Sequence, residues 1–255
     1  MPRVASGDAS WHTLEVSSED AGPSGSRRLL VVAIASLAGF LGLAGVAATK
    51  HLSDLDLLAR TLVHLARNPL LDPAMNAISG LGENYGLVPL IALGVAALWP
   101  RSRRWALALP LLMAGTGVLQ LGAKWVVDRP RPNLAAGGFP SGHVLSLVVF
   151  FGLAIYLLHG STRPRRQRWL GSAGAAAIVL AVAFSRLYLE AHWLSDVAGG
   201  FALGIAYLLP AICLVEWVAG HADGAREASA QNLTLTLPTT NGPEPTLIRL
   251  ASRSE

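Results

Sequence analysis

Charged residues and cysteine are both scarce in this 255-residue chain, in which Asp, Glu, Lys and Arg make up 14% and hydrophobic residues 52%. Such a composition leaves too little polar surface for a soluble globule of this length. The single cysteine, Cys213, lies in an apolar run and can form no intrachain disulfide, so cysteine usage says nothing about the redox compartment. Glycine is plentiful instead, with 26 residues, and small side chains let membrane helices pack closely. We therefore expect a single membrane domain.

Long apolar runs occupy most of the chain. The first, at 29–48, is uncharged and long enough to cross a bilayer at about 1.5 Å rise per residue. Further runs that could cross a membrane lie at 85–99, 105–127, 144–158, 171–187 and 197–215. Together they predict an all-α, polytopic membrane protein with six transmembrane helices.

Between the first two runs, residues 54–67 follow a different pattern, in which leucines recur at helical spacing among charged residues. This pattern predicts an amphipathic helix that lies at the membrane interface and ends at Asn68 and Pro69. The leucines of this apolar stripe are Leu55, Leu58, Leu62 and Leu65.

The two ends of the chain are polar and have no apolar periodicity. We expect 1–28 and 220–255 to be disordered cytoplasmic tails on either side of one membrane domain at 29–219. A cleaved signal peptide is disfavoured, because the first apolar run is too long and the segment before it carries acidic residues.

Arginine clusters set the expected orientation. Arg27 and Arg28, a group at 101–104 and a group at 163–168 flank alternate ends of the predicted spans, and the positive-inside rule places such clusters in the cytoplasm. Both termini are then cytoplasmic, in a multi-pass protein of the cell (inner) membrane. The clusters also account for the net charge of +4 without a nucleic-acid partner.

The opposite, extracytoplasmic face receives ionisable residues from three connections, and so many cations on that side require a functional explanation. The first connection begins at Lys124, in the last turn of a predicted helix, and continues to Arg131. Pro130 and Pro132 stop the helix and keep this segment extended, so that both cations can converge on one anion. Basic side chains that merely snorkel to the interface are the alternative for this motif taken alone.

The second connection ends in Pro140-Ser141-Gly142-His143, directly before an apolar helix. Ser141 is a natural helix cap, and Gly142 lets the backbone approach an anion closely. Free N–H groups at the positive end of the helix dipole can then bind phosphate, with His143 beside them. A common Ser-Gly turn with a surface histidine is the alternative.

The third connection carries Ser185 and Arg186 and, further on, His192 and Asp196. The four-residue spacing puts His192 and Asp196 on one helix face. A hydrogen bond from one ring nitrogen to the carboxylate would fix the tautomer and leave the other nitrogen free to attack phosphorus. The planar guanidinium of Arg186 suits two phosphate oxygens. A His/Asp pair that only stabilises the helix is the alternative.

Taken in order, the three motifs resemble the signature of the type 2 phosphatidic acid phosphatase superfamily, which comprises membrane lipid phosphatases and is related in motif to the vanadium haloperoxidases. Its pattern is Lys-x6-Arg-Pro, then Pro-Ser-Gly-His, then Ser-Arg-x5-His-x3-Asp, and this chain departs from it at no signature position. The motifs extend from Lys124 to Asp196, and the six-helix layout extends the resemblance to 29–215.

The resemblance implies a phosphatase that hydrolyses a lipid phosphate or diphosphate of the undecaprenyl diphosphate, phosphatidylglycerophosphate or phosphatidate type. It implies that His192 attacks phosphorus to form a phosphohistidine, that Asp196 orients it, and that His143 protonates the leaving oxygen and then activates water. The implied phosphate-binding residues are Lys124, Arg131, Ser141, Gly142 and Arg186. Physical reasoning agrees, because phosphoryl transfer needs mainly positioning and charge stabilisation. No cofactor or metal is expected, since the sequence shows no carboxylate cluster suited to magnesium.

Three other functions compete with this one. A lipid phosphotransferase would use the same phosphohistidine and pass the phosphoryl group to an acceptor other than water. A vanadium haloperoxidase is disfavoured by the predicted spans, since the relatives with that activity are soluble. A transporter with an ion relay of Arg186, His192 and Asp196 is disfavoured because these residues lie at helix ends rather than at the midplane. The expected partners are the lipid substrate and the bilayer, and the sequence leaves the oligomeric state open.

Overall fold

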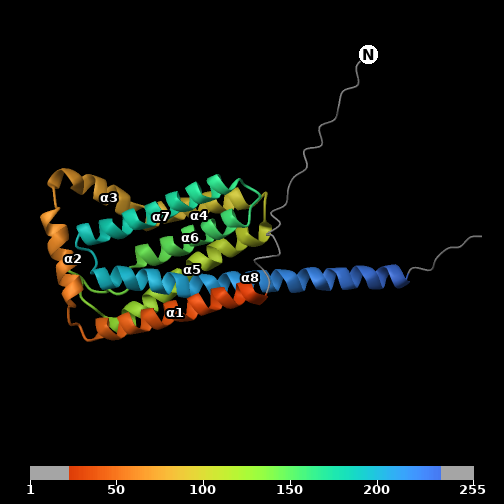
Figure 1. Ribbon diagram of the computed structural model, residues 1–255, viewed down its shortest axis with the longest axis horizontal. Coiled ribbons are helices and arrows are strands. Elements are labelled where there is room, and N and C mark those ends of the chain that lie inside the picture. Colours follow the sequence, from red (N-terminus) through yellow and green to blue (C-terminus); the bar gives the residue numbers. More distant parts are fainter. Residues whose placement is uncertain (1–22, 237–255) are drawn as a thin grey trace, which may run out of the picture. The chain divides into compact units, whose positions relative to one another are not determined.

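The computed structural model describes residues 23–236, and every regular element in that range is a helix (Figure 1). In chain order these are α1 (Pro23–Ala48), α2 (Asp54–Leu65), the 3-10 helix η1 (Pro69–Leu71), α3 (Asp72–Gly80), α4 (Asn84–Leu98), α5 (Arg103–Val127), α6 (Gly142–His159), α7 (Arg165–Tyr188) and α8 (Leu194–Thr236). The predicted all-α class is confirmed for these residues. The chain divides into two compact units after Glu216, and the first contains the helices that surround the site.

Within the described part of the chain, five helices are long and apolar enough to cross a membrane. They are α1 from Gly25 onward, α5, α6, α7, and α8 as far as Ala222. The segment Pro69–Gly80 and α4 pass the same test together, as a pair bent by 46°. The polytopic helical protein predicted from the sequence is therefore present, with five spans, or six if the bent pair crosses as one.

Some helix ends differ from the expected boundaries. α1 begins before residue 29, and α8 continues past residue 220 to Thr236, where an irregular tail was expected. Residues 220–236 are rich in alanine and contain no proline, so nothing in them stops a helix that is already propagating. The rest of the two predicted tails, 1–22 and 237–255, lies outside the described residues.

The predicted amphipathic helix is present as α2, which runs across one end of the bundle in Figure 1. Ser53 caps it, because its Oγ accepts a hydrogen bond from the N–H of Asp56 at 3.1 Å. The four leucines of the apolar stripe are between 54% and 80% exposed, whereas Asp56 is 1% exposed. The helix thus turns its apolar face away from the protein and buries a carboxylate. A surface helix of a soluble globular protein shows the reverse arrangement.

The segment that forms α3 shows no apolar pattern that predicts a regular element. This nine-residue helix packs against α7, and a break at residues 81–83 separates it from α4. A Cβ at Gly86 would lie 2.2 Å from the carbonyl oxygen of Gly80, so the break is a tightly closed corner. Its short length and mixed composition hid α3 from a periodicity argument.

Two glycines let α8 approach the turn that precedes α6. A Cβ at Gly200 would lie 2.7 Å from the carbonyl oxygen of Ser141, and one at Gly199 would lie 2.4 Å from Cε2 of the fully buried Phe139. The N–H of Ser141 also donates to the carbonyl oxygen of Asp196 at 2.9 Å. These contacts hold the second motif against the third at the same end of the bundle.

Candidate active site

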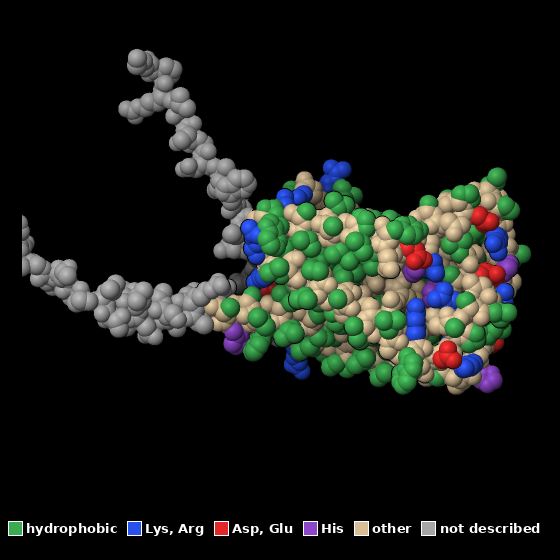
Figure 2. All heavy atoms as spheres, turned by 180° about the vertical axis from the view of Figure 1, so that it is seen from behind, with side chains coloured by type: hydrophobic (Ala, Val, Ile, Leu, Met, Phe, Trp, Pro, Cys, Tyr) green, Lys and Arg blue, Asp and Glu red, His purple; other side chains and the backbone are tan. Residues whose placement is uncertain are grey.

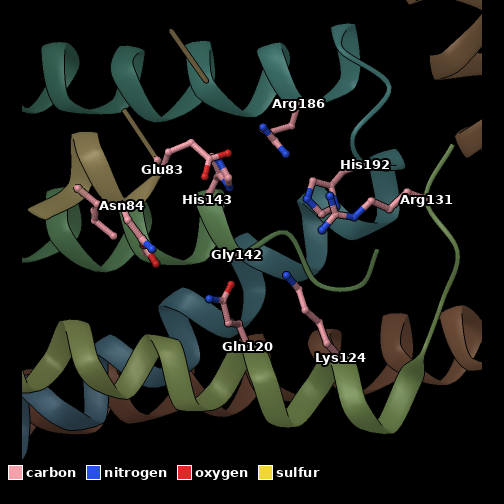
Figure 3. A pocket seen from close by; sticks show the side chains of 12 residues that line it. Glu83, Asn84, Gln120, Lys124, Arg131, Gly142, His143, Arg186 and His192 are labelled. Carbon is pink, nitrogen blue, oxygen red and sulfur yellow. The ribbon is translucent and has the colours of Figure 1, made fainter. Parts of the chain in front are cut away.

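A cavity of about 330 Å³ lies among α4, α5, α6 and α7. Charged side chains and histidines gather around a hollow at this end of the bundle, beyond a largely hydrophobic surface (Figure 2). Six of the eight predicted site residues line the cavity, namely Lys124, Arg131, Gly142, His143, Arg186 and His192 (Figure 3). The other two, Ser141 and Asp196, are fully buried behind its wall. The structure therefore brings all three motifs together.

The first motif delivers two cations from the end of α5. Lys124 lies in the last turn of the helix, as predicted, and the helix ends at Val127 before the two prolines. Asp128 then adopts a left-handed conformation with φ of 39°, which turns the chain out of the helix. The N–H of Arg131 donates to the carbonyl oxygen of Ala135 at 2.8 Å and closes a short loop. This loop holds the guanidinium of Arg131 at the cavity.

A third cation, Arg186, comes from the last turn of α7. Its Nη1 donates to Ser79 Oγ on α3 at 2.5 Å. Among the described side chains, no carboxylate forms an ion pair with Lys124, Arg131 or Arg186. Three cations that face one cavity without a paired anion suit a ligand with two negative charges, such as a phosphoryl group.

The second motif begins α6, but its serine does not cap the helix through its side chain. Ser141 occupies the cap position and makes no side-chain hydrogen bond to the helix, which corrects the predicted capping contact. Its Oγ is buried without a partner among the described residues. At Gly142 a Cβ would lie 1.6 Å from Gln120 Oε1, so a larger residue there would displace the amide of Gln120 in the cavity. The first N–H groups of a helix have no intrahelical acceptor, and those of α6 remain available to an anion.

In the third motif, His192 lies just before α8 and Asp196 lies in its first turn. His192 Nδ1 is 3.4 Å from Asp196 Oδ2, but the two atoms are not aligned as a hydrogen bond, and Oδ2 accepts from the N–H of Trp193 at 3.0 Å. A close electrostatic contact thus replaces the predicted hydrogen bond. Burial lowers the pKa of His192 below its usual value, although the Asp196 carboxylate raises it. The ring is therefore neutral near neutral pH, which is the form that a nucleophile requires.

A buried charge network supports Asp196 from behind, and the sequence did not predict it. Arg129 donates from Nη1 to Asp196 Oδ1 at 3.1 Å and from Nη2 to Asp56 Oδ2 at 2.8 Å. The backbone N–H and the hydroxyl of Ser195 also donate to Asp56, both at 2.8 Å. Burial alone would raise the pKa of Asp56, but these contacts outweigh it and hold the pKa below its usual value. The carboxylate behind His192 is thus tied to α2.

The cavity also contains polar residues outside the three motifs. Glu83, Asn84 and Gln120 line it (Figure 3), and Glu83 Oε1 lies 3.0 Å from His143 Nε2. Gln120 precedes Lys124 by one helical turn, and this spacing was a usable signal for a shared helix face. Glu83 carried no such signal, because it lies in a connection between helices that shows no motif.

Comparison with known proteins identifies the family. Residues 105–219 match the family model of the PAP2 superfamily. Phosphatidylglycerophosphatase B of Bacillus subtilis is 31% identical over 175 residues, which cover 65% of this chain and 86% of that protein. This chain belongs to the PAP2 superfamily. The resemblance predicted from the three motifs is thereby confirmed.

Two further comparisons agree with this family. An undecaprenyl-diphosphatase of Sulfolobus acidocaldarius is 28% identical over 155 residues, which cover 56% of this chain and 70% of that protein. A crystal structure of a transmembrane PAP2 type phosphatidylglycerolphosphate phosphatase from Bacillus subtilis is similar with a TM-score of 0.63 and 26% identity, covering 72% of this chain and 96% of that one. This PAP2 protein is accordingly an enzyme, a lipid phosphatase embedded in a membrane.

Proposed function

We propose that this PAP2 phosphatase hydrolyses a lipid phosphate or diphosphate through a phosphohistidine on His192. The observation that carries the proposal is the convergence of two histidines and three cations on one cavity (Figure 3). A phosphoryl group in transfer holds negative charge on its equatorial oxygens, and preorganised cations around those oxygens stabilise it.

In the first step, the lone pair of His192 Nε2 attacks phosphorus, and the bond between phosphorus and the leaving lipid oxygen breaks. His143 donates a proton to that oxygen. Asp196 stabilises the positive charge that develops on the imidazole across the 3.4 Å contact. The phosphate oxygens are bound by Lys124, Arg131, Ser141, Gly142 and Arg186.

In the second step, His143 is neutral and accepts a proton from water, whose oxygen attacks phosphorus. The bond between phosphorus and His192 breaks, inorganic phosphate leaves, and the imidazole returns to its neutral form. The cycle consumes one water molecule and releases the dephosphorylated lipid, or the lipid monophosphate when the substrate is a diphosphate.

These steps need no metal ion. Among the described residues, no group of three or more His, Cys, Asp or Glu side chains is placed to hold one. Lys124, Arg131 and Arg186 supply the positive charge that magnesium supplies in many other phosphoryl-transfer sites.

We place the enzyme in the cell (inner) membrane with six crossings, both termini in the cytoplasm and the cavity on the extracytoplasmic side. The arginine clusters at the other end of the spans support this orientation, and the outward apolar face of α2 supports an interfacial position. A cavity at the ends of apolar helices admits a headgroup while the lipid tail stays in the bilayer. The family resemblance and the names of two relatives support an undecaprenyl diphosphate, a phosphatidylglycerophosphate or a phosphatidate as the substrate.

The test uses purified full-length protein in detergent with EDTA and a panel of these three lipid classes. Wild type should release inorganic phosphate without an added acceptor, and rapid acid-free quenching should trap phosphate on His192. His192→Ala should lose at least about 10³-fold in activity, because the nucleophile is absent. Phosphate release by His192→Ala at the wild-type rate would refute the proposal. Phosphate transfer that requires an alcohol acceptor would indicate the phosphotransferase instead.

A further inference from the structure

The corner between α3 and α4 forms one wall of the cavity. Gly82, Glu83 and Asn84 all line the cavity, and a Cβ on Gly82 would lie 2.6 Å from His143 Cδ2. The corner backbone therefore packs directly on the imidazole. The preceding helix also supplies Ser79, which holds Arg186. This corner and the helix before it thus contact His143 and Arg186, although no motif marks them.

Glu83 reaches from the corner to the imidazole of His143. Its Oε1 lies 3.0 Å from Nε2, at hydrogen-bond distance. Among the described residues, no side chain hydrogen-bonds to the other ring nitrogen, Nδ1. The Glu83 side chain is 47% exposed and that of His143 is 15% exposed, so the carboxylate stands at the mouth of the site and the ring stands further in. Among the described residues that line the cavity, Glu83 is the one carboxylate.

The other neighbours of His143 oppose a charge on its ring. Lys124 from α5, Arg131 from the loop after α5 and Arg186 from α7 are basic residues that line the same cavity, and His192 adds a second imidazole. Each positive neighbour disfavours a second proton on His143. A general acid must nevertheless carry that proton when the leaving oxygen departs. An anion in contact with the ring can keep the proton there.

We propose that Glu83 is a positioning residue that holds the proton on His143 for delivery to the leaving oxygen. The inference rests on the proposed function, because it takes His143 as the general acid. In the charged ring, Nε2–H donates to Glu83 and Nδ1–H faces the leaving oxygen. As the bond from phosphorus to that oxygen breaks, the Nδ1 proton moves to the oxygen. The Nε2–H group keeps its hydrogen bond to Glu83 throughout. The Nδ1 lone pair then accepts a proton from the attacking water.

This role predicts a dependence on the leaving group. An alkyl phosphate releases a strongly basic alkoxide that needs the proton, whereas p-nitrophenyl phosphate releases a stable phenolate that does not. The value of kcat/KM reports formation of the phosphohistidine, so it isolates the step in which the leaving group is protonated. Loss of Glu83 should therefore impair turnover of the alkyl phosphate selectively.

The experiment compares kcat/KM of wild type and Glu83→Gln on hexyl phosphate and on p-nitrophenyl phosphate, with the full-length protein in detergent. Since general acids contribute about 10² to 10⁴-fold, we expect kcat/KM to fall at least about 10-fold on hexyl phosphate and less than about 3-fold on p-nitrophenyl phosphate. The alkaline limb of the hexyl phosphate profile should move to lower pH, because the ring loses its proton more readily without the anion. Glu83→Asp keeps the charge and should recover part of the loss.

Glu216→Gln is the matched control. Glu216 bonds Arg104 and Tyr156 and lies twenty residues along the chain from Asp196, so the ratio between the two substrates should stay at the wild-type value. Equal losses on both substrates in Glu83→Gln, or no loss on either, would overturn the role of Glu83. Phosphate trapped on His192 in Glu83→Gln would show that the phosphohistidine mechanism holds whether or not Glu83 has this role. A wild-type enzyme that traps no phosphate on His192 would refute the proposed function itself.

Discussion

The buried network behind Asp196 makes a quantitative prediction about Asp56. Arg129 Nη2 and both donors of Ser195 converge on this carboxylate at 2.8 Å. Asp56→Asn keeps the size of the side chain but removes its charge and turns an NH₂ group toward a donor. Removing one partner of a buried ion pair costs about 3–5 kcal/mol. In a chain of about this size each kcal/mol of lost stability lowers Tm by about 2–4 °C, so the expected decrease is roughly 6–20 °C.

The same prediction has a definite pH dependence. The contacts of Asp56 hold its pKa below the usual value, so the folded state binds this proton less readily than the unfolded chain. The stabilisation is complete above the usual aspartate pKa of about 3.9 and is lost as pH falls through that value toward the lower folded one. The difference in stability between wild type and Asp56→Asn should therefore be largest near neutral pH and should shrink below about pH 4.

Unfolding can be followed with a maleimide dye that reacts with Cys213, the single cysteine of the chain, which is partly buried on α8. The control is Asp128→Asn, which changes a carboxylate whose side chain is 70% exposed and should alter the free energy of unfolding by less than about 0.5 kcal/mol. An unfolding temperature of Asp56→Asn equal to that of wild type at pH 7, or a deficit that is the same well below pH 4 as at pH 7, would refute the role of this ion pair.

Two further predictions concern the cavity itself. In Gly142→Ala the new methyl group would lie 1.6 Å from Gln120 Oε1 and would displace this amide, which lines the cavity. Steady-state activity should fall by up to about 10²-fold and should partly return when Gln120→Ala is added. Full activity in the single variant would show that the position of the Gln120 amide does not matter to the reaction. In the proposed mechanism the neutral ring of His192 attacks phosphorus, and burial lowers the pKa of this ring. The acid limb of kcat/KM should therefore have its midpoint below the usual histidine value of about 6.5, and a midpoint above that value would exclude this state of the ring.

The candidate site residues that were predicted from the sequence and that the structure brings to the cavity all lie at or near the end of a helix. The two prolines stop α5 just after Lys124, and a glycine opens α6 beside His143. The four-residue spacing from His192 to Asp196 keeps both groups on one side of the start of α8. Helix ends are set by local chemistry, so these placements follow from short stretches of sequence.

The residues that the sequence missed depend on contacts between distant segments. Arg129 reaches Asp56 across 73 positions, and Glu83 reaches His143 across 60. In the helical pattern of α2, Asp56 belongs to the polar face, which predicts exposure to solvent rather than burial. Its burial follows from the way α2 lies across the end of the bundle (Figure 1), and no local signal specifies that angle.

Charges of opposite sign stand on the two sides of the His192 ring. In front of it, Lys124, Arg131 and Arg186 face the cavity without ion-pair partners among the described residues. Behind it, the buried network contains two carboxylates and one guanidinium, so one negative charge remains uncompensated beside Nδ1. In the proposed mechanism, attack on phosphorus moves electron density from the ring toward the cavity. This arrangement would then stabilise both the positive charge left on the ring and the negative charge on the phosphoryl oxygens. The network that ties Asp196 to α2 would therefore stabilise the charges that develop during the reaction, and it also stabilises the fold.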